Sequence, residues 1–337
     1  MSAENLWSGR RVRIVDGSSF SMPDTPENQE AYPQPSAQSP GCGFPVARFV
    51  TLTSWSTGNV LDADEDALSV HERTLFHRLW HRLMPGDVLL SDRGFCSYAD
   101  LVTLNKRGVD AVMRLVQNRR VDFRKGRRLG PGDHLVTWPK PAIRPRWLSP
   151  EAFDALPEEI TLREIRFRIH VAGFRSREIT VVTTLLDPVA FPKEALAQLY
   201  RDRWFVELDL RHLKISMHMD VLRGKSPDIV RKEFWAHLLA YNLLRGLLAD
   251  AADHKASVAR RLSIKGSLQR LSVYVPQFIS SAKESQDNQL TQLLRDIRND
   301  PVPDRPDRVE PRARKRRPKP YPLLTVPRAI AREKIAS

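Results

Sequence analysis

The order of apolar segments along the first 116 residues constrains the fold of this 337-residue chain more than any other feature. Apolar and polar residues alternate in segments that predict strands, and a helical apolar spacing separates some of them. Gly and Pro mark the boundaries, as at the turn Pro85-Gly86-Asp87. The predicted elements are, in chain order, strands at 11–16, 46–55 and 57–64, a helix at 69–84, a strand at 87–92, a helix at 98–108 and a strand at 109–116.

This element order is that of a ribonuclease-H-like mixed sheet, so the predicted fold class is α/β. In this interpretation the first strand ends at Asp16 and the fourth at Asp92. Residues 117–186 differ, because strict alternation at 164–171 and an apolar return at 178–186 predict a β-hairpin. We interpret this stretch as a β-rich insertion that does not continue the α/β core.

Helical patterns follow the insertion up to about residue 300. The predicted regions are the first part of the core at 1–116, the β-rich insertion at 117–186, the helical second part of the core at 187–250, a C-terminal helical region at 251–300 and a basic tail at 301–337. Because the tail is rich in Pro and Arg, we expect it to be disordered.

The net charge of +14 favours nucleic acid as a partner. Residues 117–150 hold nine Lys and Arg against two Asp, and residues 301–337 hold eleven Lys and Arg against four acids. The run at 312–320 predicts non-specific phosphate binding without sequence readout. No apolar run reaches membrane-spanning length, and two cysteines give no disulfide framework, so we expect a cytoplasmic protein without a membrane contact.

Four polar residues share one face of the helix predicted to open at Pro192. Tyr200, Arg203, Glu207 and Lys214 lie at offsets of 0, 3, 7 and 14, which at about 100° per residue places them within a stripe roughly 60° wide. One carboxylate among two cations and a phenol is a poor core face. It suits a site where a metal ligand lies beside phosphates.

Two further carboxylates, Asp16 and Asp92, are predicted at strand ends, where catalytic groups gather in open α/β sheets. With Glu207 they make three carboxylates, enough to hold two Mg²⁺ ions at a phosphodiester. Each has a simpler interpretation when taken alone. The two aspartates could form turns, and Glu207 could pair with Arg203 or Arg211 on the helix surface.

These residues carry a resemblance to a known family. The Val-Asp-Gly at Asp16, the Leu-Leu-Ser-Asp-Arg-Gly-Phe at Asp92 and the Y-x2-R-x3-E-x6-K signature from Tyr200 to Lys214 resemble insertion-sequence transposases of the DDE type. More narrowly, the chain resembles the insertion-sequence-four family, which has a β-rich insertion before its glutamate. The resemblance covers about residues 6 to 250, and its most specific part is the spacing in the last signature.

The resemblance implies that Asp16, Asp92 and Glu207 are the catalytic, metal-binding triad. The cofactor would be Mg²⁺, two ions per site, with Mn²⁺ as a substitute. The implied reaction is nicking at the ends of an insertion element followed by strand transfer, which makes the protein an endonuclease that acts in DNA transposition and recombination. The implied phosphate-binding residues are Tyr200, Arg203 and Lys214, with Arg93 as a further contact.

In relatives that form DNA hairpins, a tryptophan in the insertion stacks on a flipped base. Trp138 is the position that the resemblance favours here, and Trp147 is the alternative. A base stacked on an aromatic ring contributes about 1–3 kcal/mol. Ordinary packing is the competing interpretation of Trp138.

The implied partners are double-stranded DNA, as terminal inverted repeats and as target, and a second copy in a homodimer on paired ends. Family members carry an upstream helical domain, whereas fifteen residues precede Asp16 here, so we expect this chain to lack that domain. Two other functions remain open. One is a catalytically idle DNA-binding remnant, and the other is a structure-selective nuclease without strand transfer.

Several polar residues are expected to be structural. Asp202 and Asp209 lie on the opposite side of the predicted helix from the stripe, and Glu233 lies in a later helix. His77 and His81 have metal-ligand spacing, but their helix is charged and no third ligand is near in sequence, so zinc is not favoured.

Overall fold

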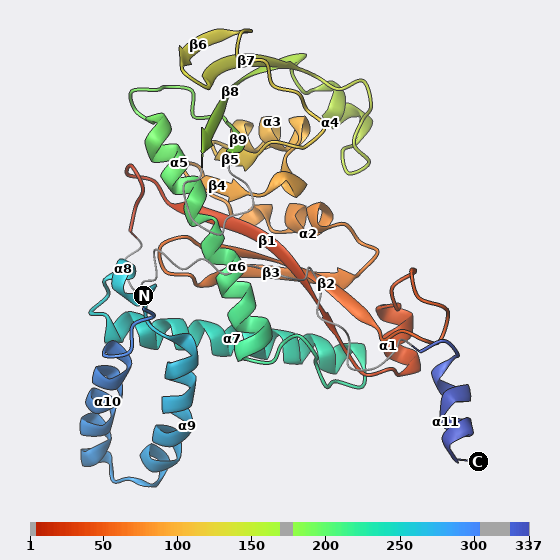
Figure 1. Cartoon of the computed structure of the whole chain (residues 1–337), viewed down its shortest axis with the longest axis vertical. Coiled ribbons are helices and arrows are strands. Elements are labelled where there is room, and N and C mark those ends of the chain that lie inside the picture. The colour runs from red at the N-terminus through yellow and green to blue at the C-terminus, as the bar shows by residue number, and fades with distance from the viewer. Residues whose placement is uncertain (1–4, 169–177, 304–323, 337) are drawn as a thin grey trace.

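The computed structural model describes residues 5–168, 178–303 and 324–336. Within them, one mixed sheet runs through the molecule in the order β3-β2-β1-β4-β5-β9-β8-β7-β6 (Figure 1). The strands are β1 Val12–Ser21, β2 Val46–Ser54, β3 Val60–Ala67, β4 Val88–Ser91, β5 Asp110–Arg114, β6 Arg127–Gly130, β7 Asp133–Pro139, β8 Glu159–Arg168 and β9 Glu178–Thr183. The predicted α/β class is confirmed.

The helices alternate with the early strands and then dominate the last third of the chain. The helices are α1 Pro26–Ala31, α2 Glu72–Arg78, α3 Tyr98–Lys106, α4 Pro150–Asp154, α5 Lys193–Asp202, α6 Trp204–Arg211, α7 Pro227–Ala251, α8 Ala256–Ala259, α9 Ile264–Ser280, α10 Lys283–Arg298 and α11 Arg328–Ala336. Short turns of other helix types are η1 Trp80–Arg82, η2 Arg93–Phe95 and the π-turn η3 His212–Ser216. None of the helices in the described residues is long and apolar enough to cross a membrane.

The sheet separates two apolar cores, because successive side chains of a strand point to opposite faces. Ile14 and Leu90 belong to the core beneath α5, α6 and α7, whereas Val15 and Leu89 belong to the core beneath α2 and α3. All four side chains are fully buried. A sheet covered on both faces requires such near-continuous apolar strands, which explains the strong strand signals in the sequence.

The prediction that the first strand ends at Asp16 is wrong. β1 continues for five more residues, and its pairing with β2 runs from Arg13 opposite Ser54 to Ser21 opposite Val46. The Asp-Gly-Ser-Ser sequence resembles a turn, but the antiparallel partner supplies the backbone hydrogen bonds that keep it extended. The fourth strand does end where predicted, since β4 stops at Ser91, one residue before Asp92.

The predicted hairpin is confirmed by the antiparallel pairing of β8 with β9, while its predicted turn at 172–176 lies outside the described residues. The separation of this region from the core is not observed. β9 pairs antiparallel with β5, through Val112 opposite Thr183, so β6 to β9 extend the core sheet. The unpaired edge of β5 offers backbone donors and acceptors that the returning strand satisfies. The region boundaries themselves stay predictions.

The prediction of a disordered tail is wrong for its last described part. α11 is helical, and Arg328 at its start forms an ion pair with Asp24 at 2.5 Å and donates to the carbonyl oxygen of Cys42. These contacts fasten the start of the helix to the loops on either side of α1. Figure 1 shows α11 near α1. The basic run at 312–320 lies outside the described residues.

Candidate active site

Asp16 and Asp92 come from neighbouring parallel strands. The register pairs Ile14 of β1 with Leu90 of β4, and each aspartate follows two residues later. The two carboxylates are therefore side by side at the point where β4 ends and β1 continues. Asp92 also caps the following turn, because its Oδ1 accepts the Gly94 N–H at 2.7 Å. The turn-forming and functional interpretations of this residue thus coexist.

Glu207 reaches the same place from α6, and one cation connects it to β1. The Arg203 guanidinium lies 2.5 Å from Glu207 Oε1 through Nη2 and 3.5 Å from Asp16 Oδ2 through Nη1. Both carboxylates therefore lie within reach of a single guanidinium group. The surface-pair interpretation of Glu207 predicted its contact with Arg203. It did not predict that Arg203 also contacts Asp16, which lies 187 positions before Arg203 in the chain.

The charges of the other two carboxylates reach Asp16. Burial raises the pKa of Asp16 to about 6, against the opposing pull of the Arg203 charge. The negative charges of Asp92 and Glu207 raise this pKa further. The side chains of Asp16 and Glu207 keep 18% and 35% of their exposure, so solvent reaches the group.

The chemistry of this donor set fits a divalent cation. Mg²⁺ prefers carboxylate oxygens and keeps several waters, so it needs only one or two carboxylates per ion. In the present side-chain arrangement, no set of three or more His, Cys, Asp or Glu among the described residues is ready to enclose a metal. The Arg203 guanidinium instead holds the place between Asp16 and Glu207. A positive charge is therefore already present where the carboxylates converge.

The polar stripe does not lie on one straight helix. α5 ends at Asp202 and α6 begins at Trp204, and the π-turn at 212–216 follows. As a result Tyr200 points inward and is only 4% exposed, with its hydroxyl donating to the carbonyl oxygen of Ser91 at 3.3 Å. The prediction that Tyr200 contacts phosphate is not supported, because its hydroxyl is directed at the backbone before Asp92.

Lys214 remains at the site despite the break in the helix. Its ammonium group donates to the Ser18 hydroxyl at 3.1 Å, and burial lowers the pKa of Lys214. Ser18 lies two residues beyond Asp16 on the same face of β1. Ser18 was not among the predicted site residues, although the period of two along the strand was the signal that could have identified it. Arg93 is exposed beside Asp92 and donates to Gln117 Oε1 at 2.9 Å.

Trp138, the residue assigned to base stacking, is packed in this structure. Trp138 is 2% exposed, and its indole N–H donates to Glu164 Oε1 at 2.9 Å. The guanidinium of Arg119, which the sequence analysis also missed, lies 3.6 Å from the ring centroid and covers one face. The packing interpretation of Trp138 is therefore the one observed.

The alternative, Trp147, is also occupied by packing, since its ring lies 4.0 Å from that of His77 and 5.5 Å from that of Trp80. His77 itself contacts Asp100 Oδ1 at 2.8 Å, and His81 contacts Asp62 Oδ2 at 3.2 Å. Each histidine thus has its own carboxylate partner.

The carboxylates that were expected to be structural have structural partners. Asp209 is 2% exposed and pairs with Arg245 and Arg260. Asp202 accepts the indole N–H of Trp55 at 3.1 Å. Glu233 accepts two backbone N–H groups in the loop before α7.

Comparison with known proteins agrees with this arrangement. The family profile of the transposase DDE domain matches residues 7–243. InsG, the transposase of insertion sequence element IS4 from Escherichia coli strain K12, is 27% identical over 324 residues, which cover 94% of this chain and 70% of InsG. The putative transposase InsL of insertion sequence element IS186A, from the same strain, is 33% identical over 73 residues, which cover 22% of this chain and 20% of InsL.

Among solved structures, a piggyBac transposase synaptic complex with hairpin DNA is similar over 87% of this chain and 57% of the piggyBac chain. The TM-score of 0.45 at 9% identity is too low to establish a shared fold. The family profile spans more than half of the chain and includes all three carboxylates. The chain therefore belongs to the transposase DDE-domain family, as a DNA transposase of the insertion-sequence-four type.

Proposed function

We propose that this chain nicks and joins the ends of an insertion element, with Asp16, Asp92 and Glu207 as its catalytic, metal-binding residues. The observation that carries the proposal is that Asp16 and Glu207, from distant parts of the chain, share the Arg203 guanidinium. The negative charge of Asp92, beside Asp16, raises the pKa of Asp16. Carboxylates that lie close together repel one another, and a bound cation relieves this repulsion.

Asp16, Asp92 and Glu207 would together hold the metal ions. Bound Mg²⁺ or Mn²⁺ supplies activation of the attacking oxygen and stabilisation of the leaving oxygen at a phosphodiester. The order β3-β2-β1-β4-β5, with helices on both faces, supports a ribonuclease-H-like core for this chemistry.

The cations around the carboxylates would hold DNA. Arg203 is placed to exchange its carboxylate partners for a phosphate, because a guanidinium forms strong paired hydrogen bonds with phosphate oxygens. Lys214 and the exposed Arg93 would contact phosphates on either side. Tyr200 has a different role in this proposal, since its hydroxyl holds the Ser91 carbonyl and thereby positions Asp92.

The substrates would be double-stranded DNA ends and target DNA, bound by a homodimer. The two rival functions predict different products. A catalytically idle remnant would bind DNA without nicking it, and the family membership does not favour it. A nuclease without strand transfer would nick DNA without producing joined molecules.

The deciding experiment compares the parent chain with Asp92→Asn on a DNA fragment that carries the element ends, with and without Mg²⁺. We expect Asp92→Asn to abolish Mg²⁺-dependent nicking and joining while retention of the DNA stays within about twofold. The matched control is Asp253→Asn, which removes an exposed carboxylate paired with Arg298 and should leave nicking unchanged. Nicking by Asp92→Asn at the parent rate would exclude Asp92 from catalysis.

A further inference from the structure

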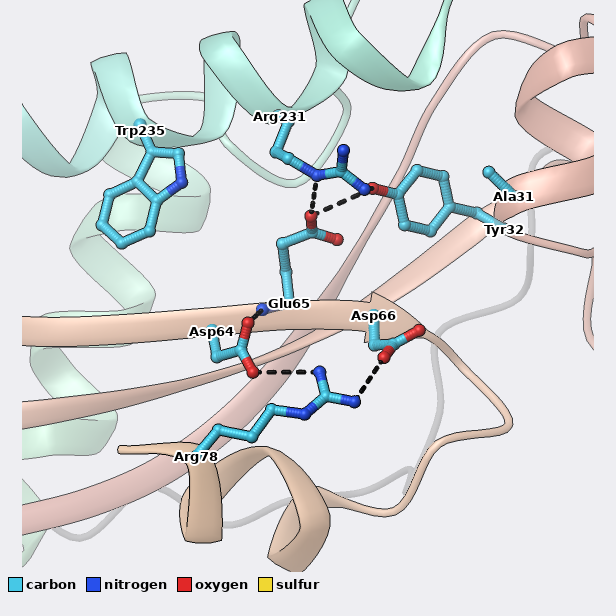
Figure 2. A pocket seen from close by; sticks show the side chains of 8 residues that line it. All are labelled: Ala31, Tyr32, Asp64, Glu65, Asp66, Arg78, Arg231 and Trp235. Atoms are coloured by element: carbon cyan, nitrogen blue, oxygen red, sulfur yellow. Dashed lines mark hydrogen bonds and ion pairs between the residues drawn. The ribbon is translucent and has the colours of Figure 1, made fainter. Parts of the chain in front are cut away.

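A cavity of about 330 Å³ lies at the outer edge of the sheet, between β3, α1 and α7, and contains none of the residues of the proposed active site. Its lining residues are Ala31, Tyr32, Asp64, Glu65, Asp66, Arg78, Arg231 and Trp235. Three carboxylates face two arginines, so the cavity is net negative in a chain whose net charge is +14. Figure 2 shows Glu65 rising from β3 into the middle of this space, with Trp235 on one side.

Glu65 is buried but incompletely paired. Its Oε1 accepts from the Tyr32 hydroxyl at 3.0 Å and from Arg231 Nε at 2.9 Å. Its Oε2 is buried and has no hydrogen-bond donor among the described residues. The whole residue is 9% exposed. A buried acceptor without a donor destabilises the fold. The cavity thus contains an unmet requirement for a hydrogen-bond donor, and a positively charged donor meets it best.

The two neighbouring carboxylates of β3, unlike Glu65, already have donors for their oxygens. Asp64 and Asp66 each accept a hydrogen bond from the Arg78 guanidinium, at 3.0 and 2.9 Å. Each also accepts the backbone N–H of the residue that follows it, which caps the free edge of β3. This arrangement blocks the addition of another strand, so a partner at this edge has to engage side chains.

Trp235 provides a second wall for a cation. Its indole is 45% exposed, and none of the described Lys or Arg side chains lies over its ring. Tryptophan is the best aromatic partner for an organic cation. One and two turns further along α7, Leu239 and Leu243 are 62% and 67% exposed, in line with Trp235. An apolar ridge therefore leads away from the acidic cavity.

We propose that this cavity binds an arginine side chain of a protein partner, with the guanidinium between Glu65 and Trp235 and with apolar neighbours of that arginine on Leu239 and Leu243. A guanidinium supplies several donors in one plane together with a flat face for the indole, which a lysine ammonium does not. DNA does not fit this surface, because the cavity is negative. A free polyamine would neutralise the charge but would lack apolar side chains to pack on Leu239 and Leu243.

The test follows the indole N–H resonance of Trp235 in the full-length chain by NMR, with Trp235→Leu to assign it. The probe is N-acetyl-arginine amide, whose only charge is the guanidinium, and the comparison compound is N-acetyl-citrulline amide, an uncharged analogue of the same shape. We expect a saturable change with the arginine compound and a response at least about tenfold weaker with the citrulline compound. Equal responses would overturn the proposal, as would no response to either compound.

Glu65→Gln keeps the shape of the side chain and should weaken binding about tenfold, with thermal unfolding as the check that the variant is folded. The matched control, Asp228→Asn on the same helix, removes an exposed carboxylate that pairs with Lys232 and should not change binding. If Glu65→Gln proves unstable, Leu239→Ala provides the second measurement. Leu239→Ala should leave binding of the arginine compound unchanged but weaken an arginine- and leucine-bearing helical peptide. Tighter binding of spermidine than of that peptide would reject a protein partner.

Discussion

Asp16→Asn should make the metal-free protein more stable while it removes the proposed catalytic function. Burial is the main reason why the pKa of Asp16 rises from 3.8 to about 6. A difference of about two pH units between the folded and unfolded states corresponds to roughly 3 kcal/mol. Asparagine preserves the shape of the side chain and can still accept the Gly17 N–H, which donates to Asp16 Oδ1 at 2.9 Å. The ionised carboxylate therefore destabilises the fold by about that amount.

The sign of the effect sets its pH dependence. Below about pH 4 the carboxyl is protonated in both the folded and unfolded states, so the charge has no effect on stability. Between about pH 4 and 6 the folded state holds the proton while the unfolded state releases it, and the free energy of unfolding falls as pH rises. Above about pH 6 the full cost is present. The advantage of Asp16→Asn should therefore grow through this window and then stay constant.

The assay is thermal unfolding in buffers that contain a chelator, at about pH 4 and about pH 8. We expect Asp16→Asn to unfold roughly 5 °C above the parent at the higher pH and within about 1 °C of it at the lower pH. Asp228→Asn, at an exposed position, should show no difference at either pH. An Asp16→Asn protein that is equally or less stable than the parent at the higher pH would refute the argument from burial.

Two further outcomes follow from the contacts of single residues. Asp209→Asn should lower the free energy of unfolding by about 3–5 kcal/mol in urea denaturation, because the buried cations of Arg245 and Arg260 lose their shared partner; a loss below about 1 kcal/mol would contradict this. Lys214→Met should weaken DNA binding and lower the slope of log affinity against log salt by about one, and an unchanged slope would mean that Lys214 makes no phosphate contact.

The sequence alone determined the order of the five core strands with α2 and α3, and it singled out Asp16, Asp92 and Glu207 as candidate site residues. Strands such as β4 are buried on both faces, so their residues had to be apolar and their signals were strong. Asp92 was proposed as a site residue because it directly follows such a strand. Glu207 was proposed from its spacing from Tyr200, Arg203 and Lys214, which depends on local helical geometry that a linear sequence records.

Tertiary contacts decided the features that depend on partners distant in the chain. β1 continues past Asp16 because β2 pairs with it, and the strands of residues 117–186 join the core because β5 had an unpaired edge. Trp138 is packed because Arg119 and Glu164 reach it from other strands and loops. The bridging position of Arg203 between Asp16 and Glu207 likewise requires β1 and α6 to be side by side, since the free energy of such contacts arises only when separate segments are brought together.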